Sequence, residues 1–476
     1  MVVIGGGITG LTAAHRLQDL GRSVVLIESS DRLGGVIRSE WHDGMLLEHG
    51  PFSVMVRCGE FVELLDELRL APIESDASGS RARFVLRDGQ LRRVPTSPGA
   101  LLSSSLVSMP AKLDLLRRMM FSPVRRQAGD VSMRDVATRR LGTEPAERLI
   151  SPACVGIFAA GAEELSADAC LPTLSAADHR ARSTLGLARS MRAGAEPARR
   201  RMMVSFDSGL ASLVTELSCR LDGVARRGTT ALSIEPGSGA RRYRVLLSEG
   251  MVECDAVVVA AGANVTARLV GGLEPSIVRR LQEIRHASLG VVHLAFDRDL
   301  VDHPCDGFGF LIPRSEPETA PVLGVIWPGS VFPFHVPDGR VLLRAMVGGT
   351  RWPTALRDSC EAIVQRTLSV LQPLLGVRGA PSSSHVSLWP DSVPVYSVGH
   401  AERVRSILEL QSRHPGVMLA GSWVCGPSGG VGVNDRVRLG RRAAEIVATE
   451  DPTPRSTAFE QECAEAASTR QEAAVV

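Results

Sequence analysis

Hydrophobic residues at the start of the chain follow the order strand, helix, strand. A short apolar run spans residues 2–4, and apolar residues then recur at the spacing of one helix face from about 9 to 20. Gly21 ends this helix, and a β-branched run over 23–27 indicates a second strand. The first 28 residues therefore predict one βαβ unit.

The pattern then alternates between strand-like and helical segments. Two apolar runs, 83–86 and 91–94, flank a turn at Asp88-Gly89, and an arginine-rich stretch over 98–200 is helical, with breaks at Pro110, Pro123 and Pro152. Strands return over 204–262 and end in the apolar run 256–262, which is typical of a buried parallel strand. Strand-like alternation over 290–350 is followed by a strand at 417–420, a glycine-rich loop over 421–432 and a helix from about 434 to 449.

Composition narrows the class of protein. The chain has 476 residues, 44% hydrophobic and 22% charged, as expected for a globular protein of two or three domains. Its formal net charge of +2 gives no general attraction to nucleic acid, so we expect no such partner. Nine cysteines without a C-x-x-C pair, and no secretory signal, indicate free thiols in the cytoplasm. We find no metal-binding cluster, catalytic triad or pair of carboxylates at a useful spacing.

The turn between the first strand and helix carries the motif Gly5-x-Gly7-x-x-Gly10. Gly5 permits the tight turn, Gly7 lets the backbone approach a pyrophosphate, and Gly10 lets the helix pack closely on the strand. Ile8 and Thr9 begin the helix, whose N-terminal N–H groups attract an anion. The motif alone is a weak signal, but Glu28 follows the second strand at the place where a ribose hydroxyl needs an acceptor. We therefore predict a dinucleotide site.

The next segment favours FAD over NAD. Ser29 follows Glu28 directly, and Arg32-Leu33-Gly34-Gly35 comes next. This stretch resembles the R-x-G-G segment of the amine oxidase and phytoene desaturase class of flavoproteins, in which the arginine and glycines surround the pyrophosphate and the flavin side.

Further blocks, in the same order along nearly the whole chain, resemble the protoporphyrinogen oxidase family. They are Glu48-His49-Gly50-Pro51, Arg83 to Pro95, Gly156-Ile157-Phe158-Ala159, Glu164-Leu165-Ser166, Ser205 to Leu210, Gly307 to Pro313, Met346 to Gly349, Tyr396 to His400 and Gly430 to Asp435. The resemblance implies that FAD also contacts Gly50, Pro51, Ala261, Gly421, Gly432, Val433 and Asn434.

The resemblance also implies roles at the substrate. Arg83 matches an arginine that pairs with a propionate, which suits its planar, always charged guanidinium. Phe308, Leu311, Phe332 and Met346 match residues that line a tetrapyrrole pocket, although each is equally compatible with an ordinary core position. Gly156 matches a glycine beside the reacting macrocycle, where a side chain would obstruct approach to the flavin; its role is pocket geometry, since the flavin performs the chemistry.

The family's reaction is the oxidation of protoporphyrinogen IX to protoporphyrin IX, in haem biosynthesis. Three hydride transfers to flavin N5 remove six electrons, and O2 reoxidises the flavin to give H2O2. Such chemistry needs orientation and an apolar pocket more than a strong protein base.

Two departures from the family leave the substrate open. Ala160 and Gly161 replace a glycine and an acidic residue of the family, and the loop Gly421 to Gly429 is about four residues longer. Coproporphyrinogen III is a close alternative, although Asn434-Asp435 favours the protoporphyrinogen branch. A flavin amine oxidase or desaturase acting on another metabolite, or a flavin-binding protein without turnover, are the remaining alternatives.

These observations predict an α/β (α+β) protein with a discontinuous Rossmann-like FAD-binding domain, a mixed-sheet substrate domain and a helical insertion. The FAD-binding domain is expected at 1–75, 204–285 and 395–450, the substrate domain at 76–97 and 286–394, the helical domain at 98–203 and a flexible tail at 451–476.

Two interpretations of the helical domain remain open. Apolar residues between Ala100 and Arg126, flanked by arginines, fit either a domain core or a basic amphipathic stretch that contacts the inner face of a membrane. The family resemblance favours such peripheral contact, and a homodimer is the oligomeric state we consider.

Overall fold

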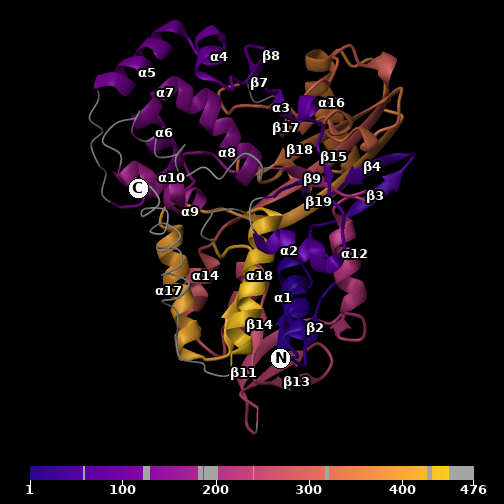
Figure 1. Cartoon of the computed structure of the whole chain (residues 1–476), viewed down its shortest axis with the longest axis vertical. Helices are drawn as coiled ribbons and strands as arrows, with labels where there is room; N and C mark the ends of the chain where they lie inside the picture. The colour runs from indigo at the N-terminus through magenta and orange to yellow at the C-terminus, as the bar shows by residue number, and fades with distance from the viewer. Residues whose placement is uncertain are drawn as a thin grey trace.

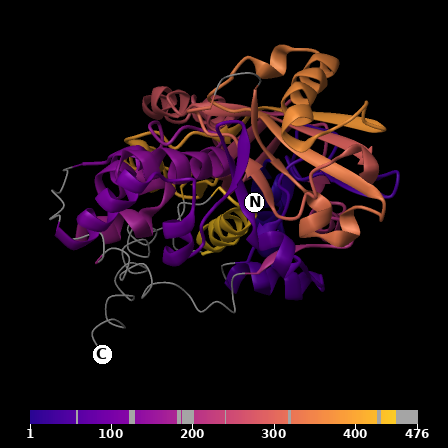
Figure 2. The same cartoon turned by 90° about the horizontal axis from the view of Figure 1, so that it is seen from above.

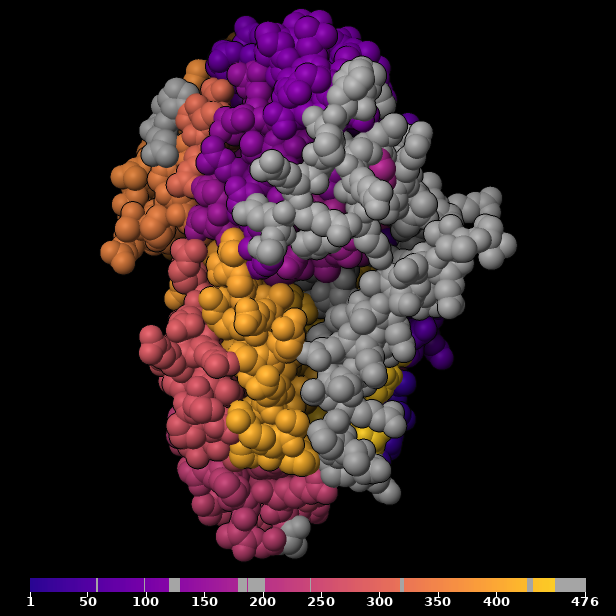
Figure 3. Space-filling model, turned by 90° about the vertical axis from the view of Figure 1, so that its left-hand side faces the viewer, coloured from indigo at the N-terminus to yellow at the C-terminus, as the bar shows by residue number. Residues whose placement is uncertain are grey.

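The computed structural model describes residues 1–56, 59–121, 129–180, 186, 202–239, 241–316, 321–425 and 431–449. Figure 1 shows an elongated molecule: a sheet carrying the N-terminus lies at one end, a larger sheet lies at the other, and a group of helices in purple lies beside the larger sheet. The view from above confirms that these helices and the larger sheet stand next to one another (Figure 2). On the face shown in Figure 3 the purple helices form the upper end, above the orange helix α17 (His400–Arg413).

Five parallel strands form the sheet at the N-terminal end. Their order is β10 (Ala225–Arg226), β2 (Val25–Ile27), β1 (Val2–Ile4), β14 (Val257–Val259) and β20 (Val417–Leu419). Val2 on the central strand lies opposite both Val25 and Val257. Helix α1 (Ile8–Asp19) joins β1 to β2 and packs on helix α18 (Val433–Ala448). The predicted βαβ unit is therefore confirmed, as are the strands at 257–259 and 417–419 and the last helix.

Smaller antiparallel sheets and helices surround this sheet. The sheets pair β3 (Ser39–His42) with β4 (Met45–Glu48), β9 (Met203–Ser205) with β5 (Val54–Met55) and β6 (Ile73–Glu74), and β12 (Tyr243–Leu247) with β11 (Ala231–Pro236) and β13 (Met251–Cys254). The helices are α2 (Gly59–Leu68), α12 (Ala211–Arg220), α13 (Ala263–Val270) and α14 (Val278–Gln282).

A seven-stranded mixed sheet forms the other end. Its order is β19 (Ser383–Pro394), β15 (His286–Asp297), β18 (Arg340–Gly348), β17 (Val322–Ile326), β16 (Gly309–Leu311), β7 (Arg83–Arg87) and β8 (Gln90–Arg93). Only β16 and β7 run parallel among its described pairs. The predicted hairpin turn is confirmed: Asp88 and Gly89 both have positive φ, 50° and 72°. Helix α16 (Cys360–Leu375) covers β15 and β19.

Residues 98–180 form short helices, and one of them begins at Met109, next to the break expected at Pro110. They are α4 (Pro98–Ser103), α5 (Met109–Phe121), α6 (Met133–Leu141), α7 (Thr143–Pro145), the π-helical turn 146–150, α8 (Ser151–Phe158), α9 (Ala167–Cys170) and α10 (Pro172–Arg180). The part of this helical stretch at 122–126, with Pro123, and the tail 451–476 lie outside the described residues.

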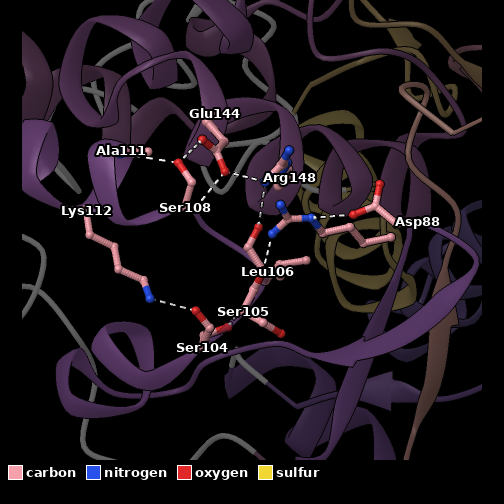
Figure 4. A network of polar contacts seen from close by, with 10 residues as sticks. Asp88, Ser104, Ser105, Leu106, Ser108, Ala111, Lys112, Glu144 and Arg148 are labelled. Carbon is pink, nitrogen blue, oxygen red and sulfur yellow. Dashed lines mark hydrogen bonds and ion pairs between the residues drawn. The ribbon is translucent and has the colours of Figure 1, made fainter.

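Side chains hold the break between α4 and α5 in place (Figure 4). Lys112 Nζ donates to the carbonyls of Leu102 and Ser104, both at 2.7 Å, near the C-terminal end of α4. Glu144 accepts from the N–H of Ser108 at 2.7 Å and from its hydroxyl at 2.6 Å, just before α5 begins. Helix ends need such partners. The pattern of apolar residues does not predict these contacts, because Lys112 and Glu144 are distant in sequence from the groups that they bind.

Helices α1 and α18 approach closely because α18 has a glycine where they cross, and Gly10 lets α1 pack as closely on the turn before it. A Cβ placed on Gly440 would lie 2.4 Å from the carbonyl oxygen of Thr9 and 3.1 Å from Thr12 Cβ. Gly10 is equally constrained, since its Cβ would lie 1.8 Å from the carbonyl oxygen of Gly5. The backbone of α18 therefore packs directly against the first turns of α1.

We predict that Gly440→Ala destabilises the protein although alanine is the better helix former. The added methyl group would displace α18 from α1, and such overpacking lowers the free energy of unfolding by about 1–3 kcal/mol. Gly99→Ala in α4 is the control: a Cβ there meets no atom within 4 Å, so its stability should rise by up to about 1 kcal/mol. Urea unfolding followed by circular dichroism measures both. An equal effect of the two substitutions would contradict the close approach.

Candidate functional site

The glycine turn of β1 and α1 is shaped to accept an anion. Gly5 has φ of 107°, and a Cβ on it would lie 2.5 Å from the carbonyl oxygen of Ala260. A Cβ on Gly7 would meet nothing within 4 Å, so the N-terminus of α1 opens onto free space. No side chain caps this helix, whose first intrahelical bond runs from Leu11 N–H to Gly7 O at 2.9 Å. The N–H groups of Ile8, Thr9 and Gly10 are thereby left for an external acceptor.

Glu28 lies against this turn, at the end of β2. Its Oε2 accepts from Gly6 N–H at 2.6 Å, and its Oε1 accepts from Ser30 N–H at 2.8 Å. The Ser29 hydroxyl lies 3.3 Å from the same Oε1. The carboxylate is half-buried and fixed beside Gly6, where it can also accept from a ribose hydroxyl of a dinucleotide bound at the helix N-terminus.

The Arg32–Gly35 segment folds back onto the same turn. Gly34 N–H donates to Gly6 O at 2.8 Å, and a Cβ on Gly35 would lie 3.2 Å from Gly7 Cα. Arg32 donates to the carbonyls of Gly35 at 2.5 Å and Ile37 at 3.3 Å. Two glycine segments that are separate in sequence therefore form one surface, with the Arg32 guanidinium holding the shape of the second.

Gly50 and Pro51 follow β4 and depend on an arginine that the sequence analysis did not single out. Arg344 is 3% exposed; it donates to Glu48 O at 3.0 Å and to Gly50 O. A Cβ on Gly50 would lie 1.8 Å from Val36 O, so this segment touches the loop after Gly35. An arginine inside the apolar run of β18 was the available signal, because a buried guanidinium needs acceptors.

The Glu48 side chain is the counterpart of Arg344. It is 1% exposed and accepts from Leu210 N–H and from the Ser39 hydroxyl, both at 2.7 Å. Burial raises the pKa of Glu48 to about 8, while these two donors and the charge of Arg344 act in the opposite direction. Burial likewise lowers the pKa of Arg344 to about 10. Through these contacts, Arg344 and Glu48 connect β18, β4 and the start of α12.

The C-terminal residues expected at the flavin lie on the far side of β14. A Cβ on Gly421 would lie 2.1 Å from Ala261 O, the carbonyl to which Trp423 Nε1 donates at 3.2 Å. Gly432 is the uncapped first residue of α18, like Gly7 in α1, and Val433 and Asn434 are buried behind it. Asn434 donates to Met55 O, which ties α18 to the segment after Pro51. Gly426 to Gly430, and with them most of the longer loop, lie outside the described residues.

The expected substrate residues form an apolar surface on the mixed sheet. Leu311, Gly324 and Met346 stand side by side on β16, β17 and β18. A Cβ on Gly324 would lie 2.8 Å from Leu311 Cδ2, and a Cβ on Gly156 of helix α8 would lie 3.0 Å from the same atom. Gly156 is itself exposed. Leu311 thus lies between two glycines, and its side chain fills the space that a Cβ at either position would need.

Arg83 and the aromatic residues lie at one edge of this surface. The Arg83 guanidinium stands over the Phe308 ring at 5.0 Å from its centroid, and no hydrogen bond of this side chain is recorded among the described residues. Phe308 and Phe332 both contact Phe52, with ring centroids at 6.2 and 5.6 Å. Met346 packs on the same cluster. Phe332 is fully buried, so it supports the surface from behind rather than lining it.

The residues present fit FAD, because two uncapped helix N-termini and the open space at Gly7 suit its phosphates. Glu28 suits a ribose, and the Gly50–Pro51 and Gly432–Asn434 segments border the same region through Met55 and Val36. Assignment of each residue to a particular atom of FAD stays a prediction.

Comparison with known proteins gives the family. Residues 8–448 match the model of the flavin containing amine oxidoreductases. The chain is 31% identical to the coproporphyrinogen III oxidase of Propionibacterium freudenreichii, with 94% of this chain and 90% of that protein covered. It is also 31% identical to human protoporphyrinogen oxidase, with 95% and 99% covered. A crystal structure of a provisionally named protoporphyrinogen oxidase from Exiguobacterium superposes with a TM-score of 0.82 at 26% identity, covering 94% of this chain and 98% of that one.

The family match and the glycine-lined cofactor surface agree on the cofactor. The chain belongs to the flavin-containing amine oxidoreductase family and is an FAD-dependent oxidase related to the proto- and coproporphyrinogen oxidases.

Proposed function

We propose that this oxidase converts a porphyrinogen to a porphyrin, with protoporphyrinogen IX as the substrate and O2 as the electron acceptor. The observation that carries the proposal is the apolar surface of Leu311, Gly324 and Met346, with Gly156 opposite and the Arg83 guanidinium at its edge. A flat, apolar macrocycle with carboxylates at one side matches this arrangement in shape and charge.

The protein's part is to bind and orient. When bound, FAD supplies the redox chemistry, which is acceptance of hydride from the substrate and transfer of its two electrons to O2. Leu311 and Met346 exclude water from one face of the macrocycle. Arg83 pairs with a propionate and fixes the rotation of the ring, and Gly156 leaves the bridging carbon free to approach the flavin. No catalytic base is required of the chain, because the porphyrinogen is already rich in electrons.

Coproporphyrinogen III is the second candidate, since relatives of both names align over nearly the full chain. It carries four propionates where protoporphyrinogen carries two, and therefore needs more cationic partners. The observation that favours protoporphyrinogen is that Arg83 borders aromatic and aliphatic side chains: Phe308 lies beneath its guanidinium, and Phe52 and Met346 lie next.

Purified holoenzyme incubated separately with the two porphyrinogens should produce porphyrin fluorescence and H2O2. We expect kcat/KM to be at least about tenfold higher for protoporphyrinogen than for coproporphyrinogen. The two additional propionates of coproporphyrinogen would lie against apolar side chains without a cationic partner. No fluorescence above autoxidation with either compound would contradict the proposal. Formation of H2O2 only with amines would indicate an amine oxidase. If no substrate reduces the flavin and bleaches its absorption, the chain would be a flavin-binding protein without turnover.

Arg83→Ala should raise KM for the porphyrinogen by about 10- to 100-fold, the loss expected for one charge-assisted hydrogen bond, and change kcat little. The KM of Arg83→Lys should lie between those of the unchanged enzyme and Arg83→Ala, because lysine keeps the positive charge but cannot donate two parallel hydrogen bonds to one carboxylate. Arg279→Ala is the control, since that side chain is 91% exposed and lies on α14. An unchanged KM in Arg83→Ala would remove the propionate role.

Gly156→Ala should lower kcat/KM by about tenfold to a hundredfold, because the new methyl group pushes Leu311 into the substrate surface. The unfolding midpoint should not fall, since alanine favours helix α8. Adding Leu311→Ala removes the clashing atoms and should restore part of the activity. A double variant no better than Gly156→Ala would contradict this account.

We further propose that helices α4 and α5 contact a membrane surface from the cytoplasmic side. No helix among the described residues is long and apolar enough to cross a membrane. Four apolar side chains are nevertheless exposed here: Leu102 at 55%, Met109 at 60%, Leu113 at 61% and Leu116 at 42%. Arg117, 60% exposed, lies beside them and forms an ion pair with Asp114 at 2.9 Å. The homodimer stays a prediction.

Vesicles of phosphatidylcholine and phosphatidylglycerol should sediment the protein, and the double substitution Met109→Ser and Leu113→Ser should reduce the bound fraction severalfold. Leu232→Ser on β11 is the control, because that side chain is also 53% exposed but lies at the other end of the molecule. Equal sedimentation of all three proteins would contradict membrane contact through α5.

A further inference from the structure

A group of three ligand-type side chains lies on α1, about two turns beyond the glycine loop. His15 and Asp19 are one helical turn apart, and Glu67 reaches them from the C-terminal end of α2. His15 Nε2 lies 3.5 Å from Asp19 Oδ2 and 3.6 Å from Glu67 Oε2. All three ligand atoms lie within 4.8 Å of one another. This group takes no part in the site described above.

The imidazole nitrogen that faces the carboxylates has no hydrogen bond. His15 is 5% exposed, and its Nε2 lacks a hydrogen-bond partner among the described residues. A buried ring nitrogen without a partner is costly, so such a group calls for an explanation. Asp19 and Glu67 are 38% and 31% exposed, and the group therefore opens to solvent on the carboxylate side.

The spacing suits a tetrahedral cation. Zinc binds nitrogen and carboxylate oxygen at about 2.0–2.2 Å, so two of its tetrahedral ligands lie about 3.3–3.6 Å apart. The two distances from Nε2 match this range, and the two carboxylate oxygens lie within 4.8 Å of each other. We propose that His15, Asp19 and Glu67 bind one divalent cation of the Zn²⁺ class, with water as the fourth ligand.

Arg441 acts as the outer partner of this site. Its Nη1 donates to Glu67 Oε2 at 2.8 Å, and its Nη2 lies 3.3 Å from Glu63 Oε2. Arg441 is 6% exposed, so the position of the Glu67 carboxylate is set by a buried donor, as is usual for metal-binding carboxylates. The bound cation would join α1 to α2, two helices that cover the flavin sheet, and would stabilise them without taking part in catalysis.

The test uses the FAD-loaded enzyme after treatment with a chelator and dialysis. Exposed Cys219 and Cys360 are replaced by serine beforehand, because thiolates also bind zinc. Zn²⁺ is then titrated in competition with a chromogenic chelator, and Co²⁺ absorption at wavelengths beyond the flavin bands reports the coordination geometry. We expect one tight equivalent of Zn²⁺, a tetrahedral Co²⁺ spectrum and an unfolding midpoint that rises with Zn²⁺ but not with Mg²⁺.

Glu67→Gln and Asp19→Asn, both at partly exposed positions that tolerate change, should each weaken Zn²⁺ binding at least about tenfold, since even outer partners contribute that much. His15→Gln should abolish the Co²⁺ spectrum. Glu445→Gln, a carboxylate on α18 that pairs with Arg16 of α1, is the control and should leave binding intact. Absence of a tight equivalent, or equal binding in Glu67→Gln, Asp19→Asn and the control, would overturn the proposal.

Discussion

Close backbone contact around helix α1 is the constraint on which the flavin end of the molecule depends. Gly10 lets α1 lie on the turn that Gly5 forms, and Gly440 lets α18 lie on α1. With side chains at these positions, the helices would stand further from the sheet and from each other. Their uncapped N-termini, at Gly7 and Gly432, would shift with them. The same lack of side chains leaves the backbone N–H groups free to meet phosphate oxygens.

A buried arginine connects this end of the molecule to the mixed sheet. Arg344 belongs to β18 of the mixed sheet, yet its guanidinium binds carbonyls of Glu48 and Gly50 in the loop expected at the flavin. Met346, two residues further along β18, packs on the Phe52–Phe332 cluster in the apolar surface expected at the substrate. The strand therefore sets the distance between loop and surface. Removing the Arg344 guanidinium would leave the carbonyl groups of Glu48 and Gly50 without this donor in the interior, a costly change.

The sequence predicted those parts of the fold that local patterns encode. The βαβ unit, the hairpin at Asp88-Gly89 and the last helix all carry strong periodicity or turn signals, and the structure confirms them. Strand β19 was missed because it contains two prolines and alternates weakly; pairing with β15 creates it. The break near Pro110 was predicted, but the contacts of Lys112 and Glu144 that stabilise the two helix ends there were not.

The site shows the same division. Its glycines were recognisable because each has a conformational or steric reason to lack a side chain, as at Gly5 and Gly156. Arg344 and Glu48 were not singled out as a pair, and neither were His15 and Glu67, because their partners are distant in sequence. Spacing along the chain shows only which residues share a turn. Long-range pairs arise when the sheets assemble, and a single sequence carries no direct record of them.

The order of strands in the flavin sheet has a consequence for how the chain is made. Its central strand β1 comes from the first residues, whereas β14 and β20 come from the middle and the end. A ribosome therefore releases β1, α1 and β2 long before β14 and α18 exist, and α1 remains uncovered by α18 until the end of synthesis. Contacts over such separations form slowly and leave apolar surface exposed meanwhile. We therefore expect FAD to bind late in synthesis. Until then the apolar face of α1 is a surface to which chaperones can bind.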